Sequence, residues 1–305
     1  MTNPILAFSA RRRMRSIRTP IVLSLYSLLL VLIAYFCIFR PFTGETFVLS
    51  DMKTGAMGYA LIVCMQFGLL ILVAPAMISD SISGERERQT LDLLLVTHTS
   101  SWQLVVGKLL ESFGFLALMV LCSMPMLSLV LITGGASFGQ VLISVLFLLL
   151  VALAALSVGL FVSTLCKRTV TATVLSYVAV LAVGAVTFLP LWYDVKRIGD
   201  LYDAMNILGK TLHPIHYTPV AFTLCPALGL FSLLMDQTHL LDNILWGVSH
   251  SLANTRQWVN YGTFLGYHMI FLACASFALV GLAAFNLRAK KGNQPKKKVK
   301  KHEQA

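Results

Sequence analysis

The sequence predicts an all-α polytopic membrane protein with six transmembrane helices. Three observations favour this fold class. Hydrophobic residues make up 57% of the 305 residues and charged residues only 12%, whereas soluble proteins carry about 25% charged residues. Several uncharged apolar runs reach the length of about 20 residues that one membrane crossing needs. The net charge of +11 comes mainly from basic residues beside these runs, as the positive-inside rule expects.

The chain begins with a basic segment. Residues 1–20 mix apolar side chains with arginines, which predicts a cytoplasmic amphipathic helix at the headgroup level, basic side toward anionic lipid. Its membrane-surface residues are Arg11, Arg12, Arg13 and Arg15. The apolar run 21–39 predicts the first span, because its 19 residues exceed the apolar part of a typical cleaved signal peptide.

The second span is predicted at residues 57–79, with a kink at Pro75 near its cytoplasmic end. A dense charged stretch follows at residues 80–98. Four charges alternate in sign there, and the leucines after them fall on one face of a helix. This pattern predicts a short amphipathic helix under the membrane, polar face toward a soluble partner. A solvated loop is the alternative.

The next spans follow from charge and turn signals. Ser100 and Gln103 match a capping box, so a helix is expected to restart there. Residues 112–166 carry no charge and are interrupted by two glycines near the middle, which predicts the third and fourth spans. Lys167 and Arg168 mark the next cytoplasmic turn, and residues 169–193 predict a fifth span that ends near Pro190.

The last third of the chain is mixed. Residues 194–256 are predicted as a long external region, and within them residues 211–235 carry three prolines, which disfavour a straight span. We expect re-entrant or interfacial helices there. The last span lies within residues 257–287, and residues 288–305 form a disordered basic cytoplasmic tail. On this layout 18 of the 24 Lys and Arg residues are cytoplasmic, as are both termini.

Two motifs invite a catalytic interpretation. Residues 135–139 match the Gly-x-Ser-x-Gly nucleophile pattern, so an intramembrane serine protease that uses Ser137 with His268 as base is one alternative function. The favoured interpretation is a glycine-rich turn capped by Ser137. A nucleotide-binding loop is not predicted, because Ala204 stands where the first glycine before Gly209, Lys210 and Thr211 belongs.

Metal binding and self-contained transport are also disfavoured. The external histidines are interpreted as interfacial or hydrogen-bonded rather than as a transition-metal site; they are His213, His216, His239 and His250. A self-contained channel or carrier is a further alternative function. Proton- or ion-driven carriers usually need ionisable residues inside the membrane, and the spans carry almost none, which weakens this alternative. Small residues four apart, at Ala155, Gly159 and Ser163 and at Gly262 and Gly266, predict close helix packing or a dimer.

The charged stretch resembles the signature of type-2 ABC exporter permeases. In that family a Glu-Arg pair, a Thr-Leu-Glu/Asp step and a leucine run precede a Gly-Lys at the foot of the third span. The matching residues here are Glu85, Arg86, Thr90, Leu91, Asp92, Leu93, Leu94, Leu95, Gly107 and Lys108. The sequence departs from the family where His98, not proline, follows Thr97 and where the N-terminal segment lacks an acidic residue.

The resemblance implies a non-catalytic permease subunit in the cell (cytoplasmic or inner) membrane. Two such subunits, identical or related, would pair and bind separate ABC ATPase subunits that hold ATP and Mg, so no cofactor is expected in this chain and no nucleic acid among its partners. Residues 80–98 would be the coupling helix and the turn at 166–169 a second contact. The implied ATPase-coupling residues are Glu85, Arg86, Glu87, Arg88, Thr90, Leu91, Asp92, Lys167 and Arg168.

Overall fold

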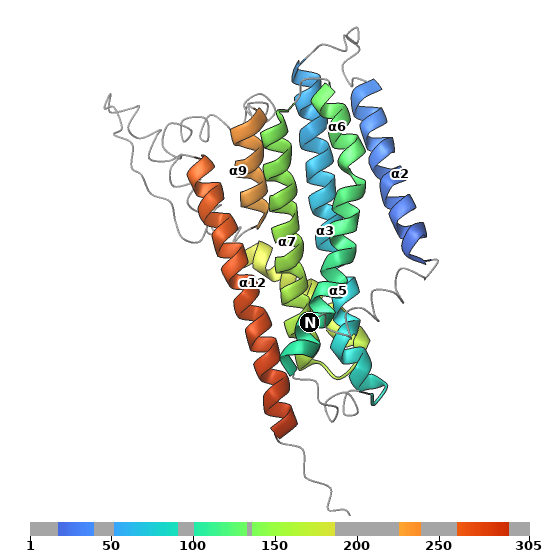
Figure 1. Ribbon diagram of the computed structural model, residues 1–305, viewed down its shortest axis with the longest axis vertical. Coiled ribbons are helices and arrows are strands. Elements are labelled where there is room, and N and C mark those ends of the chain that lie inside the picture. Colours follow the sequence, from blue (N-terminus) through green and yellow to red (C-terminus); the bar gives the residue numbers. More distant parts are fainter. Residues whose placement is uncertain are drawn as a thin grey trace, which may run out of the picture.

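The computed structural model describes residues 18–39, 52–90, 101–132, 136–186, 226–238 and 261–292. Regular structure within these ranges is entirely helical, and most of the helices run roughly along one long axis (Figure 1). Its elements are α2 (Arg18–Phe39), α3 (Met52–Glu87), α5 (Ser101–Cys122), α6 (Met124–Ile132), α7 (Phe138–Leu165), a helix Thr169–Val186, α9 (Pro226–Thr238) and α12 (Tyr261–Gly292).

Within the described ranges, five helical segments are long and apolar enough to cross a membrane: Gly58–Glu87, Ser101–Ile132, Phe138–Leu165, Thr169–Val186 and Leu265–Arg288. They coincide with the predicted second to sixth spans, so the all-α, multi-span fold class is confirmed. The predicted first span coincides with α2 (Arg18–Phe39), which is not among these five segments. Six crossings therefore stay a prediction, and residues 1–17, which hold the predicted surface arginines, lie outside the described ranges.

Helix α3 is longer than the sequence predicted. Its 36 residues span about 54 Å at 1.5 Å per residue, well beyond a hydrocarbon core of about 30 Å. The uncharged part ends at residue 79, so the charged end projects past the apolar region. Residues 80–87 continue α3 and do not begin a separate helix, because buried Ile78 and Ile82 extend the apolar stripe by one more turn. Residues 91–98 lie outside the described ranges.

The predicted third span is broken at Ser123, which separates α5 from α6. Pro125 follows closely, and its ring nitrogen has no hydrogen to continue the ladder of α5. The Ser123 hydroxyl donates to the Val120 carbonyl at 2.6 Å and accepts from Gln66 Nε2 on α3 at 2.8 Å. The break is therefore held by a polar contact inside the bundle.

Helix α7 forms the centre of the bundle and packs against α3, α5 and α12. The small residue at Gly159 makes the contact with α3 close: a Cβ there would lie 2.4 Å from Ile78 Cγ2. The predicted close packing is thus confirmed at Gly159. Among the described residues, a Cβ at Gly266 would have no neighbour within 4 Å, so close packing is not seen there.

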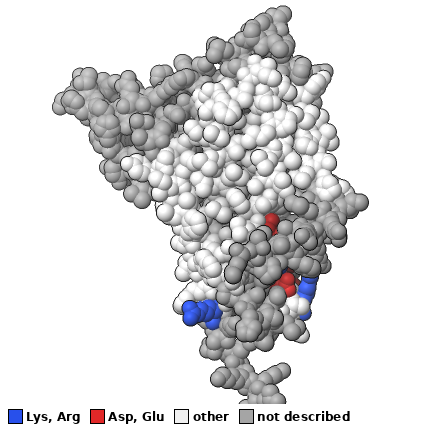
Figure 2. Space-filling model, viewed as in Figure 1, with Lys and Arg blue, Asp and Glu red and all other residues white. Residues whose placement is uncertain are grey.

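Helix α9 lies beside α12 and α7 (Figure 1). Its 13 residues span about 20 Å, too short for one crossing, and it begins at Pro226, which suits the first turn of a helix. This agrees with the expectation that residues 211–235 do not form a straight span. The charged side chains visible in Figure 2 lie toward one end of the bundle, below a broad uncharged surface.

Candidate functional site

The candidate site is the charged end of the bundle, built around residues 79–90 at the end of α3. Four other segments meet it: the foot of α5, the end of α7, the turn at residues 166–168 and the start of the helix Thr169–Val186. The resemblance implied residues 80–98 and the turn at 166–169 as partner contacts, and residues 80–90 are the described part of the first. The structure brings them together.

Ser163 on α7 joins the two longest helices of the site. Its hydroxyl donates to the carbonyl oxygen of Ser79 at 2.7 Å and accepts from the Ser83 amide at 3.0 Å. In a regular α-helix these two groups, four residues apart, would pair with each other. The Ser163 hydroxyl therefore contacts the same two main-chain groups, while α3 runs unbroken to Glu87.

Arg86 binds the end of α7. Its guanidinium donates to the carbonyl oxygen of Cys166 at 2.6 Å and to that of Thr164 at 3.1 Å. Cys166 is the C-cap of α7. The last carbonyls of a helix lack partners within the helix and carry partial negative charge, so a cation stabilises them.

Glu87 binds the start of the next helix. Its carboxylate accepts from the Thr169 amide at 3.0 Å and from the Thr169 hydroxyl at 2.8 Å. The first amides of a helix favour an anion for the converse reason. These two hydrogen bonds, followed by the nearby charges of Arg168 and Arg88, lower the pKa of Glu87.

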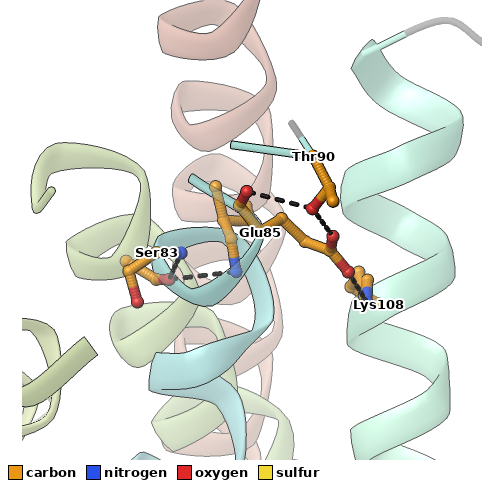
Figure 3. Close-up of polar contacts among 6 residues, drawn as sticks. Ser83, Glu85, Thr90 and Lys108 are labelled. Carbon is orange, nitrogen blue, oxygen red and sulfur yellow. Dashed lines mark hydrogen bonds and ion pairs between the residues drawn. The ribbon is translucent and has the colours of Figure 1, made fainter. Parts of the chain in front are cut away.

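Glu85 ties the end of α3 to α5. Its carboxylate accepts from Lys108 Nζ at 3.3 Å and also from the Thr90 hydroxyl (Figure 3). Burial alone would raise the pKa of Glu85, but the Thr90 hydrogen bond and the Lys108 charge together lower it. The ion pair links two helices, α3 and α5.

Helix α3 ends in a Schellman motif. The Thr90 amide donates to the Glu85 carbonyl at 2.9 Å, and the Gln89 amide donates to the Arg86 carbonyl at 3.1 Å. Gln89 has φ 59°, the left-handed conformation that this motif requires and that glycine usually supplies. The chain therefore leaves α3 at a defined turn.

The remaining predicted coupling residues divide into two groups. The side chains of Arg88, Lys167 and Arg168 are exposed. Leu91 and Asp92 lie outside the described ranges, as do the external histidines and the basic tail from residue 293. Sequence reasoning missed Ser79 and Ser83 and the hydrogen bonds of Ser163 and Thr169. Ser163 was predicted only as a small packing residue, and Thr169 only as part of the turn at 166–169.

Ser137 and His268 are not brought together. Ser137 caps α7, where its hydroxyl accepts from the Gln140 amide at 3.3 Å and its own amide donates to the Gln140 side chain at 2.7 Å. His268 on α12 is buried beside Phe147, with ring centroids 6.1 Å apart. Ten residues of α7 separate Ser137 from Phe147, about 15 Å along the helix. The geometry supports the interpretation of Ser137 as a cap.

What the site can do follows from these contacts. Within the described ranges no three His, Cys, Asp or Glu side chains gather as a metal site. The charged end instead connects α3, α5, α7 and the helix Thr169–Val186 through polar contacts. A displacement of one of these segments is therefore expected to move the others.

Comparison with protein families shows which family the chain matches. The model of a family described as ABC-2 family transporter protein matches residues 40–285, which is most of the chain and includes every part of the charged end. The comparison with curated proteins found no match.

Proposed function

Because the chain belongs to the ABC-2 transporter family, we propose that it is the membrane-spanning permease subunit of an ATP-driven exporter. ATP and Mg are held by a separate ATPase subunit, and this chain is not catalytic. The family match is the observation that carries the proposal. The long apolar helices support it, since they provide the spans that a multi-pass membrane subunit needs.

The charged end of the bundle supports a contact with a soluble partner. It is the part of α3 that extends past the uncharged segment, and it carries exposed Arg88, Lys167 and Arg168. We place this end, with both termini, on the cytoplasmic side of the cell membrane, because basic residues beside spans favour that side. ATP-driven movement of the partner then acts on α3 and α7, and two permease subunits, identical or related, enclose the substrate path.

The test is a pull-down of the tagged chain from gently solubilised membranes. The proposal expects an ATP-binding subunit to co-purify with the wild type. It expects a Lys167→Glu/Arg168→Glu variant to lose that subunit, because the reversed charges repel the same partner surface. Arg288→Glu on α12 is the matched control, since Arg288 is an exposed basic residue outside both the end of α3 and the turn at 166–169. Absence of any ATP-binding subunit from the wild-type sample would refute the proposal.

A further inference from the structure

Arg86 and Glu87 are adjacent in the chain and bind opposite sides of one turn. Arg86 takes the last carbonyls of α7, and Glu87 takes the first amide of the helix Thr169–Val186. Each side chain has the charge that its helix end favours. Two consecutive residues of α3 therefore hold the turn between α7 and the next helix from both ends.

The charges of the site thus have two different uses. Glu85, Arg86 and Glu87 make short contacts within the chain. Arg88 is exposed, and it lies with Arg168 close enough to Glu87 for both to act on that carboxylate. Lys167 is next to Arg168 and is also exposed. Glu87 is itself exposed, and the exposed charges that follow it on the helix end and on the turn, Arg88, Lys167 and Arg168, are basic.

We infer that Arg86 and Glu87 are positioning residues that clamp the 166–169 turn to the end of α3. The partner then meets one basic surface formed by Arg88, Lys167 and Arg168 in place of two independent contacts. An acidic surface on the ATPase subunit is the complement that this charge favours. The identity of the partner rests on the proposed function, whereas the clamp rests on contacts within the chain alone.

The clamp is tested on the purified chain without any partner, by hydrogen exchange of backbone amides in peptides that cover residues 166–172. Arg86→Gln and Glu87→Ala should speed this exchange about tenfold, because each removes charge-assisted hydrogen bonds to the turn. Glu87→Gln should restore nearly wild-type exchange, since its amide oxygen still accepts from Thr169. Arg88→Gln, one residue further along the same helix end, is the control and should change nothing.

A second measurement asks whether the clamp acts on binding. The dissociation constant for the co-purifying ATPase subunit should rise in Arg86→Gln, because the two segments must then be ordered together on binding. It should stay at the wild-type value in Glu87→Gln and rise in a salt-dependent manner in Arg88→Gln, whose exchange is unchanged.

The outcomes separate the two proposals. Wild-type exchange in both Arg86→Gln and Glu87→Ala, or equally fast exchange in Arg88→Gln, would overturn the clamp whether or not an ATPase binds. Weaker binding of Arg86→Gln with unchanged exchange would make Arg86 a direct partner contact and would also overturn the clamp.

The basic surface has its own outcome. If Arg88→Gln binds the ATPase normally but loses affinity for vesicles of anionic lipid, the basic surface faces the membrane, and the inference that it meets the ATPase fails. Capture of no ATPase refutes the proposed function and leaves the exchange result standing.

Discussion

The Ser163 hydroxyl on α7 donates to the main-chain carbonyl of Ser79 on α3 at 2.7 Å. The contact requires a small polar side chain at a close helix crossing. Gly159, one turn earlier on α7, faces Ile78 and Pro75 of α3 without a side chain between them. The two residues together let α7 reach the backbone of α3, and this contact lies beside the clamp formed by Arg86 and Glu87.

Ser163→Ala should destabilise the bundle. The alanine cannot bridge the Ser79 carbonyl and the Ser83 amide, both of which are buried. The Ser79 carbonyl still accepts from the Ser83 hydroxyl, so we expect a loss of about 1 kcal/mol in the free energy of unfolding. Ser157→Ala is the matched control on α7, because the Ser157 hydroxyl donates to the Ala154 carbonyl of its own helix. Unfolding in a denaturing-detergent titration measures both. Equal losses in the two variants would contradict the bridging role of Ser163.

Gly159→Ala should also destabilise the chain. The new Cβ would lie 2.4 Å from Ile78 Cγ2, and a β-branched side chain has few rotamers with which to move away. Overpacking of this kind costs about 1–3 kcal/mol. Gly114→Ala on α5 is the control, since a Cβ there has nothing within 4 Å and alanine is the better helix former. A stable Gly159→Ala variant would show that α7 and α3 are not in close contact.

The spans could be predicted because they depend on long uncharged runs, and a crossing needs such runs wherever it lies. The limits of individual helices could not. Residues 80–87 look like a separate polar element, yet buried Ile78 and Ile82 carry α3 through them. The break at Ser123 was missed as well, because the apolar run continues past it and only Pro125 marks the interruption.

The charged end was found from the sequence, since alternating charges between apolar runs are rare. What each charge binds could not be predicted, because the partners are distant in the chain. Arg86 binds carbonyls about 80 residues away. Every residue has a main-chain carbonyl, so the sequence does not show which one accepts a hydrogen bond. Gln89 gave no helix-stop signal either, because glycine usually occupies that position.

Gln89→Gly should stabilise the end of α3. A non-glycine residue at φ 59° carries a steric cost of about 1 kcal/mol that glycine avoids. The Schellman hydrogen bonds of Thr90 and Gln89 use main-chain atoms and remain in the variant. We expect a gain of up to about 1 kcal/mol in the free energy of unfolding, against no gain in Gln89→Ala, which keeps the Cβ. Destabilisation by glycine would mean that the Gln89 side chain makes a contact of its own.

Ser137→Ala should leave the function of the chain intact. Its hydroxyl serves as a helix cap, so its loss should cost about 1 kcal/mol of stability, and Gln140→Ala should cost a similar amount by removing the other half of the capping box. ATPase capture in the pull-down measures function, and thermal unfolding measures stability. Loss of a proteolytic activity in a Ser137→Ala variant of full stability would restore the protease interpretation.

Gly229→Ala should loosen the contact between α9 and α12. A Cβ at Gly229 would lie 2.3 Å from His268 Cδ2 and 2.9 Å from Phe147 Cε2. His268 is fully buried, so its ring has no free space to enter, and we expect a loss of about 1–3 kcal/mol.

The cause of that loss can be checked in the same unfolding measurement. In a His268→Ala background the ring is absent, so Gly229→Ala should cost less than about 1 kcal/mol, since coupled neighbours are not additive. Gly266→Ala on α12 is the control without a neighbour. An undiminished cost in the His268→Ala background would show that Phe147, rather than His268, sets the distance between α9 and the bundle.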